Sequence, residues 1–359
     1  MNARQQLLVL TIAIITLHSC KKQTGLSPTN QIVNNETISA PVGGNYWQAR
    51  AFFTAPRTAA VSFAINGKGY LFGGYQGGQF RKDLWEYNTS SDTWTQKASL
   101  PLLSKGRMSS AAFVINNKGY VVGGDIEYTP ANGYQTAETW GYDPAVNTWI
   151  QRASIPVGRG RATGFAINGK GYIAFGSNES VDLFMDEVLE YDPAANTWTS
   201  ISHLTAPNKD LGRYQAVSFV INNKAYMGTG FGPSGTNFCL KDFWEFDPAT
   251  LVWTQKADFG PGARAAAVGF GSGSLGYVGT GYFIESGVNY NMNDFWSYSA
   301  GSNIWTKKAN FPGYGRYGAS GFYVGGRGWL GHGYRPNYYS TNDFYRYSPS
   351  TSIISPSIN

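Results

Sequence analysis

The sequence predicts an all-β protein in which one four-stranded unit is repeated six times. The 359-residue chain contains 45 glycines and 16% aromatic residues, but only 14% charged residues. Such a composition is typical of many short strands joined by glycine turns. In addition, a segment like "INGKGYLFGGY" recurs at intervals of about fifty residues. The hydrophobic content of 42% is sufficient for a large buried core.

Each repeat is recognised by the aromatic residue that corresponds to the tyrosine of "INGKGYLFGGY". These anchors are Tyr70, Tyr120, Tyr172, Tyr226, Tyr277 and Trp329. A glycine stands four positions after each anchor: Gly74, Gly124, Gly176, Gly230, Gly281 and Gly333. An arginine stands thirteen positions before each anchor: Arg57, Arg107, Arg159, Arg213, Arg264 and Arg316. This fixed register indicates that the six units share one structure.

The first complete unit shows the expected strands in order. The apolar run "AVSFAI" (60–65) is followed by an Asn-Gly pair, which favours a hairpin turn because both central residues of that turn need a positive φ. The strand "GYLFGG" (69–74) comes next, and then a variable loop. The segments "DLWEY" (83–87) and "TWTQKA" (93–98), separated by a turn, supply the third and fourth strands.

Four strands per repeat and six repeats predict a six-bladed β-propeller. The motifs and their spacing resemble the Kelch family over about Asn45 to Ser352. The Gly-Gly pair typical of that family is present only in the first two units. Later units have Phe175, Thr229, Thr280 and His332 in place of the first glycine.

A fragment near the N-terminus resembles the last strand of a blade. Trp94, Trp149, Trp198, Trp253 and Trp305 occupy one position of the first five units, and the sixth unit has Ile354 there. Trp47, in "NYWQARAFFTAP", matches this tryptophan position. We therefore expect the N-terminal strand to close the ring as the outer strand of the last blade, since open edges are a liability. The alternative is that "TSIIS" (351–355) supplies this strand.

The N-terminal residues resemble a bacterial lipoprotein signal. An apolar run from Leu7 to Leu17 precedes Leu-His-Ser-Cys, in which Cys20 is the expected lipidation site. Alternatives are a plain secretory signal and an uncleaved anchor. The expected organisation is a signal peptide (1–20), a linker (21–44), the propeller (45–352) and a tail (353–359). We expect an outer-membrane lipoprotein that contacts the membrane only through its lipid. The periplasmic side is favoured, since no acidic run follows Cys20.

The charge and the reactive side chains argue against several classes of protein. The net charge of +6 comes from scattered Lys and Arg without a basic stripe, so nucleic acid is not an expected partner. After the signal, only His203, His332 and Cys239 could serve as histidine or thiolate ligands. Their positions do not fit a zinc site or the copper site of galactose oxidase, whose fold Kelch propellers resemble. We therefore predict no metal and no cofactor, and a non-enzymatic role is favoured.

Residues that every unit repeats are expected to form the scaffold. Each unit carries an acid near its third strand: Asp83, Glu138, Glu187, Asp242, Asp294 and Asp343. We expect these acids to pair with the six repeated arginines, because a hydrogen-bonded Arg–carboxylate pair tolerates burial. The alternative is a ring of charges that binds an anion. We expect the repeated tryptophans to pack between blades rather than to bind sugars.

Function is expected where the units differ, at one mouth of the central channel. Arg161, Tyr214 and Tyr317 depart from the repeat at the start of their blades, and Arg161 is expected to contact an anionic ligand. The variable loops add four further candidates: Glu127, Glu179, Glu285 and Arg335. Tyrosines suit glycans and peptides alike.

Together these residues predict a ligand- or protein-binding module of the cell envelope, with a glycan, an acidic sugar or a protein as the ligand. The alternative is a metal-free carbohydrate-active enzyme. Bacterial sialic acid mutarotases are also six-bladed Kelch propellers, and anomer exchange needs only acid–base groups and a cation. Arg161 or Arg335 would then be the cation. Glu127, Glu179 or Glu285 would be the acid–base group.

Overall fold

The computed structural model describes residues 44–129, 133–205, 211–236, 238–335 and 338–349, which all belong to one compact unit, Val42–Asn359. These residues form strands, turns and loops and no helix. The described part of the chain accordingly offers no helix that could cross a membrane. Cys20 and the predicted signal peptide lie outside the described residues.

The unit contains six four-stranded sheets, here called blades 1 to 6, and all their strand pairs are antiparallel. From the inner to the outer strand, blade 1 consists of β2 (Val61–Ile65), β3 (Lys68–Phe72), β6 (Leu84–Asn88) and β7 (Thr93–Lys97). Blade 2 consists of β9 (Ala111–Ile115), β10 (Lys118–Val122), β13 (Thr139–Asp143) and β14 (Thr148–Arg152). Blade 3 consists of β15 (Thr163–Ile167), β16 (Lys170–Ala174), β17 (Glu187–Asp192) and β18 (Thr197–His203).

Blade 4 consists of β19 (Val217–Ile221), β20 (Lys224–Gly228), β22 (Phe243–Asp247) and β23 (Val252–Lys256). Blade 5 consists of β24 (Val268–Gly271), β25 (Leu275–Gly279), β28 (Phe295–Ser299) and β29 (Ile304–Lys307). Blade 6 consists of β30 (Ser320–Val324), β31 (Arg327–Gly331), β34 (Phe344–Ser348) and β1 (Tyr46–Ala49).

Short strands in the loops complete the fold. They are β4 (Tyr75–Gln76), β5 (Gln79–Phe80), β8 (Arg107–Met108), β11 (Asp125–Thr129), β12 (Gly133–Gln135), β21 (Phe231–Thr236), β26 (Tyr282–Glu285), β27 (Val288–Asn291), β32 (Tyr334–Arg335) and β33 (Tyr338–Ser340).

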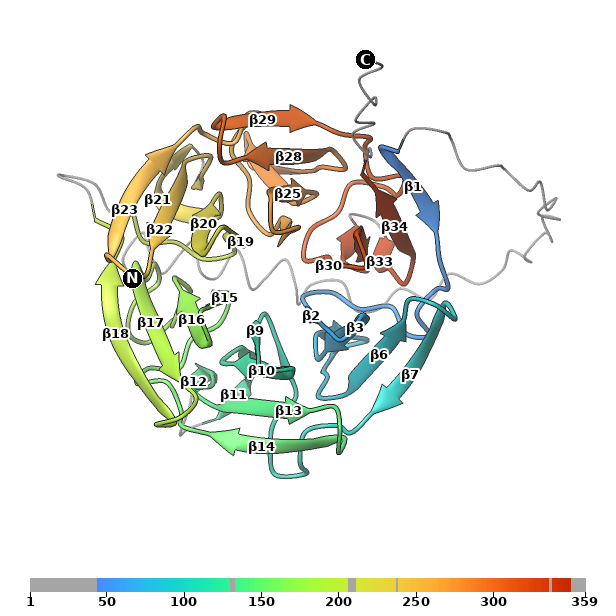
Figure 1. The fold of residues 1–359 in the computed structure, drawn as a ribbon, viewed down its shortest axis with the longest axis vertical. Helices are drawn as coiled ribbons and strands as arrows, with labels where there is room; N and C mark the ends of the chain where they lie inside the picture. The colour runs from blue at the N-terminus through green and yellow to red at the C-terminus, as the bar shows by residue number, and fades with distance from the viewer. Residues whose placement is uncertain (1–43, 130–132, 206–210, 237, 336–337, 350–359) are drawn as a thin grey trace, which may run out of the picture. The chain divides into compact units, whose positions relative to one another are not determined.

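The inner strands of the six blades surround a central channel (Figure 1). Each inner strand contacts the inner strand of the next blade, and β30 contacts β2. One backbone ring joins all six blades, and we call its members the mouth ring: Ala59, Ser109, Arg161, Gln215, Ala266 and Gly318. Each mouth-ring N–H donates to the carbonyl of the preceding member, over 2.8 to 3.1 Å. All six residues have φ between 51° and 60°, which lets the chain turn into the channel.

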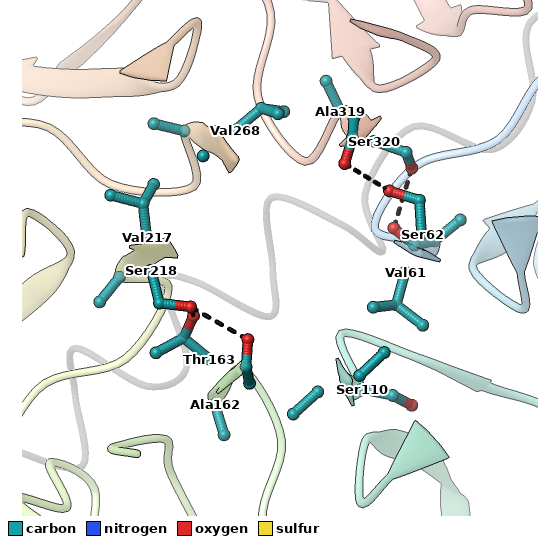
Figure 2. A pocket seen from close by; sticks show the side chains of 18 residues that line it. Val61, Ser62, Ser110, Ala162, Thr163, Val217, Ser218, Val268, Ala319 and Ser320 are labelled. Atoms are coloured by element: carbon teal, nitrogen blue, oxygen red, sulfur yellow. Dashed lines mark hydrogen bonds between the residues drawn. The ribbon is translucent and has the colours of Figure 1, made fainter. Parts of the chain in front are cut away.

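The channel beyond the mouth ring is lined by small side chains (Figure 2). The three residues after each mouth-ring member line it and enclose about 200 Å³. Its hydroxyl groups bond within the wall: Thr163 Oγ1 donates to Ser218 Oγ over 2.6 Å, and Ser320 Oγ donates to the Ala60 carbonyl over 2.9 Å.

The N-terminal strand occupies the outer position of blade 6, where the sequence places it. β1 pairs with β34, and Trp47 lies opposite Tyr347. Trp47 Nε1 donates to the Ala309 carbonyl of blade 5 over 2.8 Å. Trp149 makes the same contact with Ala98 of the blade before it, over 2.6 Å. Trp47 thus makes the contact that the sixth unit lacks in its own sequence, and the repeated tryptophans join neighbouring blades.

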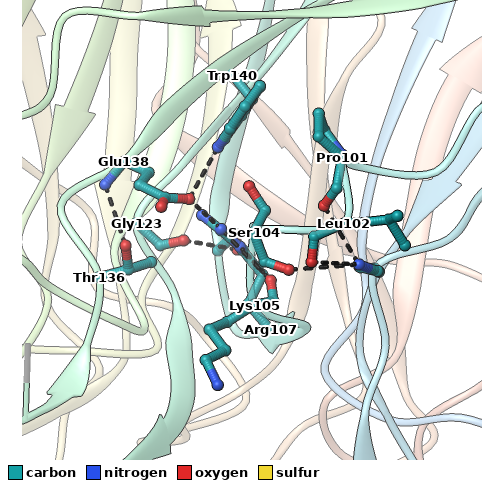
Figure 3. A network of polar contacts seen from close by, with 11 residues as sticks. Pro101, Leu102, Ser104, Lys105, Arg107, Gly123, Thr136, Glu138 and Trp140 are labelled. Atoms are coloured by element: carbon teal, nitrogen blue, oxygen red, sulfur yellow. Dashed lines mark hydrogen bonds and ion pairs between the residues drawn. The ribbon is translucent and has the colours of Figure 1, made fainter. Parts of the chain in front are cut away.

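The six repeated arginines, here called the scaffold arginines, each pair with the acid of their own blade. Arg264 shows the pattern: its guanidinium contacts both oxygens of Asp294 over 2.6 and 2.9 Å and donates to the Thr280 carbonyl over 2.9 Å. The other pairs are Arg57–Asp83, Arg107–Glu138, Arg159–Glu187, Arg213–Asp242 and Arg316–Asp343. Figure 3 shows the blade 2 pair, in which Trp140 also donates to Glu138 over 2.8 Å. The predicted pairing is confirmed.

These pairs hold their carboxylates in the charged form. Burial alone would raise the pKa of Asp294, but the hydrogen bonds and charge of Arg264 outweigh it, so that the pKa of Asp294 is lowered. The same balance lowers the pKa of Asp83, Asp242 and Asp343. The scaffold arginines are almost fully buried. Each of these pairs therefore contributes to the fold rather than to a surface charge.

His332 is a packed residue at the seam between blades 6 and 1. It is fully buried against Phe53, Trp94 and Phe344. Neither ring nitrogen has a hydrogen-bond partner among the described residues. Burial lowers the pKa of His332 to about 3, and the charge of Arg57 adds to this effect. His332 is therefore neutral and belongs to the core.

Candidate functional site

Two positions of each repeat flank the mouth ring and form its wall. The residue before each mouth-ring member is Thr58, Met108, Gly160, Tyr214, Ala265 or Tyr317. Each of these forms an antiparallel bridge with the residue that follows the repeated glycine of its blade: Tyr75, Asp125, Ser177, Phe231, Tyr282 or Tyr334. The residue that follows the repeated glycine is thus aromatic in four blades and polar only in blades 2 and 3. The polar gap in this aromatic wall lies beside Arg161.

Five polar residues fill the gap, and we call them the Arg161 cluster: Arg161, Asp125, Gln135, Ser177 and Glu179. Arg161 Nε lies 3.1 Å from Asp125 Oδ2, and Arg161 Nη2 lies 3.8 Å from Glu179 Oε1. Arg161 Nη1 donates to Ser177 Oγ over 3.4 Å. Gln135 Nε2 donates to Asp125 Oδ1 over 3.1 Å, and Gln135 Oε1 accepts from the Glu179 backbone N–H over 3.3 Å. The cluster therefore joins blades 2 and 3 at the mouth.

The local sequence explains why this cluster can form. A Cβ atom at Gly160 would lie 2.2 Å from Asp125 Oδ1, so glycine leaves the room that the carboxylate occupies. In blades 4 and 6 the corresponding pairs are aromatic, Tyr214 with Phe231 and Tyr317 with Tyr334. Departures from the repeat at adjacent positions of two neighbouring blades therefore create one polar site.

The cluster combines one guanidinium with two carboxyl groups in a largely buried place. The Arg161 side chain is 13% exposed, that of Glu179 8% and that of Asp125 5%. Burial raises the pKa of Glu179, the charge of Asp125 raises it further, and Arg161 only partly opposes this. Burial would lower the pKa of Arg161, but the electrostatic interactions with Asp125, Tyr214, Glu179 and Tyr282 together outweigh burial and raise that pKa. The guanidinium is therefore already matched by a carboxylate, and the surplus charge of the cluster is negative.

Tyrosines form the rest of the mouth. The Arg161 guanidinium lies 5.5 Å from the centre of the Tyr214 ring. Tyr282 packs edge-on against Tyr317 at 5.1 Å, and its hydroxyl donates to Gln215 Oε1 over 3.4 Å. Burial raises the pKa of Tyr214 to about 12, so its hydroxyl stays protonated at neutral pH. Of these three rings, Tyr214 and Tyr282 are buried and Tyr317 is half-buried, so Tyr317 offers most of their surface at the mouth.

The structure brings together three of the residues that the sequence proposed, Arg161, Tyr214 and Glu179, whereas Tyr317 contacts Tyr282 and Tyr334. The side chains of Glu127 and Glu285 are exposed and make no contact with the cluster in the described residues. Glu127 instead lines a separate cavity of about 430 Å³ together with Phe80 and Lys105.

Arg335 lies elsewhere, with its guanidinium 3.6 Å from the centre of the Tyr314 ring. Asp125, Gln135 and Tyr282 were not predicted as site residues. The position after the repeated glycine could have revealed Asp125, because most other blades carry an aromatic residue there.

The chemistry available at the mouth is hydrogen bonding, charge and acid–base exchange. Among the described residues, no group of three His, Cys, Asp or Glu side chains is close enough to hold a metal ion. The Cys239 thiol is buried, which raises its pKa to about 11. His203 lies on the outer strand β18, and its Nδ1 atom is 2.8 Å from Asp186 Oδ1.

Comparison with known proteins identifies the repeat. Residues 45–230, more than half of the chain, match the family described as the KLHDC2/KLHL20/DRC7 Kelch-repeats domain. Kelch-like protein 25 of Xenopus tropicalis is 28% identical over 237 residues, which cover 65% of this chain and 38% of that protein. Kelch-like protein 35 of Mus musculus is 27% identical over 226 residues, which cover 63% of this chain and 34% of that protein. The matched region is thus well under half the length of these relatives.

The solved structure of YjhT superposes with a TM-score of 0.68 over 82% of this chain and 96% of that chain. The sequence identity between the two is 17%, so this likeness concerns the fold alone.

Proposed function

The chain belongs to the Kelch-repeat family, and from this premise we propose that it is a binding module of the cell envelope whose ligand docks at the mouth beside Arg161. The observation that carries the proposal is the contrast between a repeated scaffold and one unrepeated polar cluster. The scaffold arginines each pair with an acid of their own blade, whereas the Arg161 cluster breaks the repeat at adjacent positions. Loops on a rigid scaffold are where binding residues are most often found.

The chemistry of the mouth suits a sugar unit best. Sugars present hydroxyl groups that both donate and accept, and Asp125, Gln135 and Glu179 offer matching partners. The half-buried Tyr317 adds an aromatic face against which the apolar face of a sugar ring can pack.

Anchoring through Cys20 is part of this proposal. The lipobox-like Leu-His-Ser-Cys would place the propeller at the outer membrane, on a linker that ends near Gly44. We expect Cys20→Ser to release the protein from membranes or to leave it unprocessed. A cleaved Cys20→Ser protein that still sediments with membranes would exclude a lipid anchor at this residue. Protease treatment of whole cells distinguishes the periplasmic side from the cell surface.

The test of binding is a thermal-shift screen of the protein against neutral, acidic and amino glycans, followed by calorimetry on each hit. A ligand that binds only the folded state raises the melting temperature. We expect Tyr317→Ala to weaken binding of a hit about tenfold or more. Tyr46→Ala is the control, because Tyr46 lies on β1, the outer strand of blade 6, away from the inner strands that lead to the mouth. Equal affinities of the two variants would contradict a site at the mouth.

Glu179 favours anomer exchange as a second candidate function. It is the one of the three proposed carboxyl groups that lies beside Arg161, and burial raises its pKa, as is common for acid–base groups. We would then expect the protein to accelerate mutarotation of a sugar that it binds, as followed by NMR, and Glu179→Gln to abolish the acceleration. Binding without acceleration would leave the binding module as the function.

A further inference from the structure

The charge balance of the Arg161 cluster specifies the ligand. Arg161 brings one positive charge, whereas Asp125 and Glu179 together bring two carboxyl groups. The scaffold arginines add no surplus positive charge at the mouth, because each is matched by the acid of its own blade. A carboxylate ligand would thus approach a site whose cation is already paired and whose remaining charge has the same sign as its own.

A second observation points the same way. The Asp125 side chain is only 5% exposed, and its Oδ2 atom accepts no hydrogen bond from any described residue. Arg161 Nε lies 3.1 Å from this oxygen, but the contact lacks hydrogen-bond geometry. A buried carboxylate oxygen without a donor is costly, and a ligand N–H would satisfy it.

The aromatic wall also favours a positive group. The Tyr214 ring lies next to Arg161, whereas Tyr282 packs against Tyr317 of blade 6, on the opposite side of the ring of blades. The faces of such rings attract ammonium groups, and the attraction is stronger where water is excluded. The same rings repel the negative charge of an acidic sugar.

We propose that the Arg161 cluster binds the protonated amine of an amino sugar, with Glu179 and Asp125 as the groups that receive its N–H donors. This inference rests on the proposed binding function and names the ligand class for the same mouth. A sugar fits better than a lysine side chain, because its rigid ring loses less conformational entropy on binding. The acidic sugar that the sequence suggested is thereby replaced by a sugar of opposite charge.

The test compares two oligosaccharides that differ only in acetylation, a glucosamine tetramer and an N-acetylglucosamine tetramer, by calorimetry at about pH 6, where the amine is protonated. We expect the full-length protein to bind the glucosamine tetramer about tenfold or more tightly, and Glu179→Gln to bring the two affinities to near parity. Asp258→Asn is the control, because Asp258 is an exposed carboxylate paired with Lys241. This variant should keep the preference.

Other outcomes separate this inference from the proposed function. Equal binding of the two tetramers, or preference for the acetylated one or for glucuronate, would overturn the amine assignment and leave the binding module standing. Tight binding of Nα-acetyl-lysine amide, which keeps its side-chain amine, at the same site would overturn the choice of a sugar. If no glycan and no amine binds, the proposed function itself fails. Glu179→Gln should keep its folded far-UV spectrum, so a lost preference would not reflect unfolding.

Discussion

The scaffold arginines and Arg161 both contact carboxylates, yet the two kinds of contact differ in stoichiometry and in geometry. Arg264 meets one acid through two parallel hydrogen bonds, and the pKa of Asp294 is lowered. Arg161 meets two acids through looser contacts, and the pKa of Glu179 is raised. A fully satisfied pair suits a scaffold, whereas a cluster with surplus charge is maintained at a cost to stability. The repeated arginine–acid pairs are therefore structural. The candidate site lies where residues depart from the repeat and carboxyl groups outnumber arginines.

Removal of a scaffold arginine should have the largest effect. Arg264→Ala would leave Asp294 buried without its cation, and we expect a loss of about 3–5 kcal/mol in the free energy of unfolding. Denaturation by urea measures this loss. A loss below about 1 kcal/mol would show that the repeated pairs contribute no more than surface ion pairs. The distinction between scaffold pairs and the Arg161 cluster would then be wrong.

Trp47→Ala should cost about 3 kcal/mol, because Trp47 packs against Phe295, Phe311 and Tyr347 and joins the two ends of the ring. The matched control is Trp149→Ala, which removes the same contact within the continuous part of the ring. We expect similar costs for the two variants in urea denaturation. A neutral Trp47→Ala would mean that another segment forms the outer strand of blade 6.

The sequence predicts most of the scaffold because the same residue types recur at the same positions of the repeats. The arginine–acid pairs and the place of Trp47 follow from register alone. The Arg161 cluster was only partly predictable. Arg161 stands out as a charged residue in its register, but its partner Asp125 comes from a different blade. Their contact depends on how blades 2 and 3 pack and on the space left by Gly160. Glu127 and Glu285 carry the same chemistry, but their loops leave them in solvent.

His332 also departs from the repeat, but it belongs to the core and not to the candidate site. It is buried and neutral, with a pKa of about 3 in the folded state against about 6.5 when unfolded. The unfolded chain therefore binds more protons between these values, so stability is full above about pH 6.5 and falls as the pH falls. We expect a loss of about 2 kcal/mol between about pH 7 and pH 5. His332→Phe should remove this loss, since blade 3 has Phe175 there with the same positive φ. An unchanged pH dependence in His332→Phe would contradict the assignment.

Leu251 is a departure from the repeat that we expect to weaken the scaffold. It adopts φ 59° and is 46% exposed. In blade 5 the corresponding residue is Asn303, whose side chain accepts hydrogen bonds from the Tyr298 hydroxyl and from the Ala257 backbone N–H. Asparagine tolerates this conformation better than leucine. We expect Leu251→Asn to stabilise the protein by about 1 kcal/mol in urea denaturation, without a change in ligand affinity. A destabilised variant would show that the leucine side chain has a packing role.

The most direct test of the contrast between scaffold and site measures unfolding and ligand binding in Glu179→Gln and Asp294→Asn side by side. Because the folded pKa of Glu179 is raised, its ionisation opposes folding as the pH rises above about 4.5. Glu179→Gln should therefore change the free energy of unfolding at neutral pH by no more than about 1 kcal/mol, while glycan binding weakens about tenfold. Asp294→Asn should lower stability by about 2–4 kcal/mol and leave the affinity of the remaining folded protein unchanged. The opposite pattern, with Glu179→Gln unfolded and Asp294→Asn defective in binding, would mean that the repeated pairs form the site and the Arg161 cluster the scaffold.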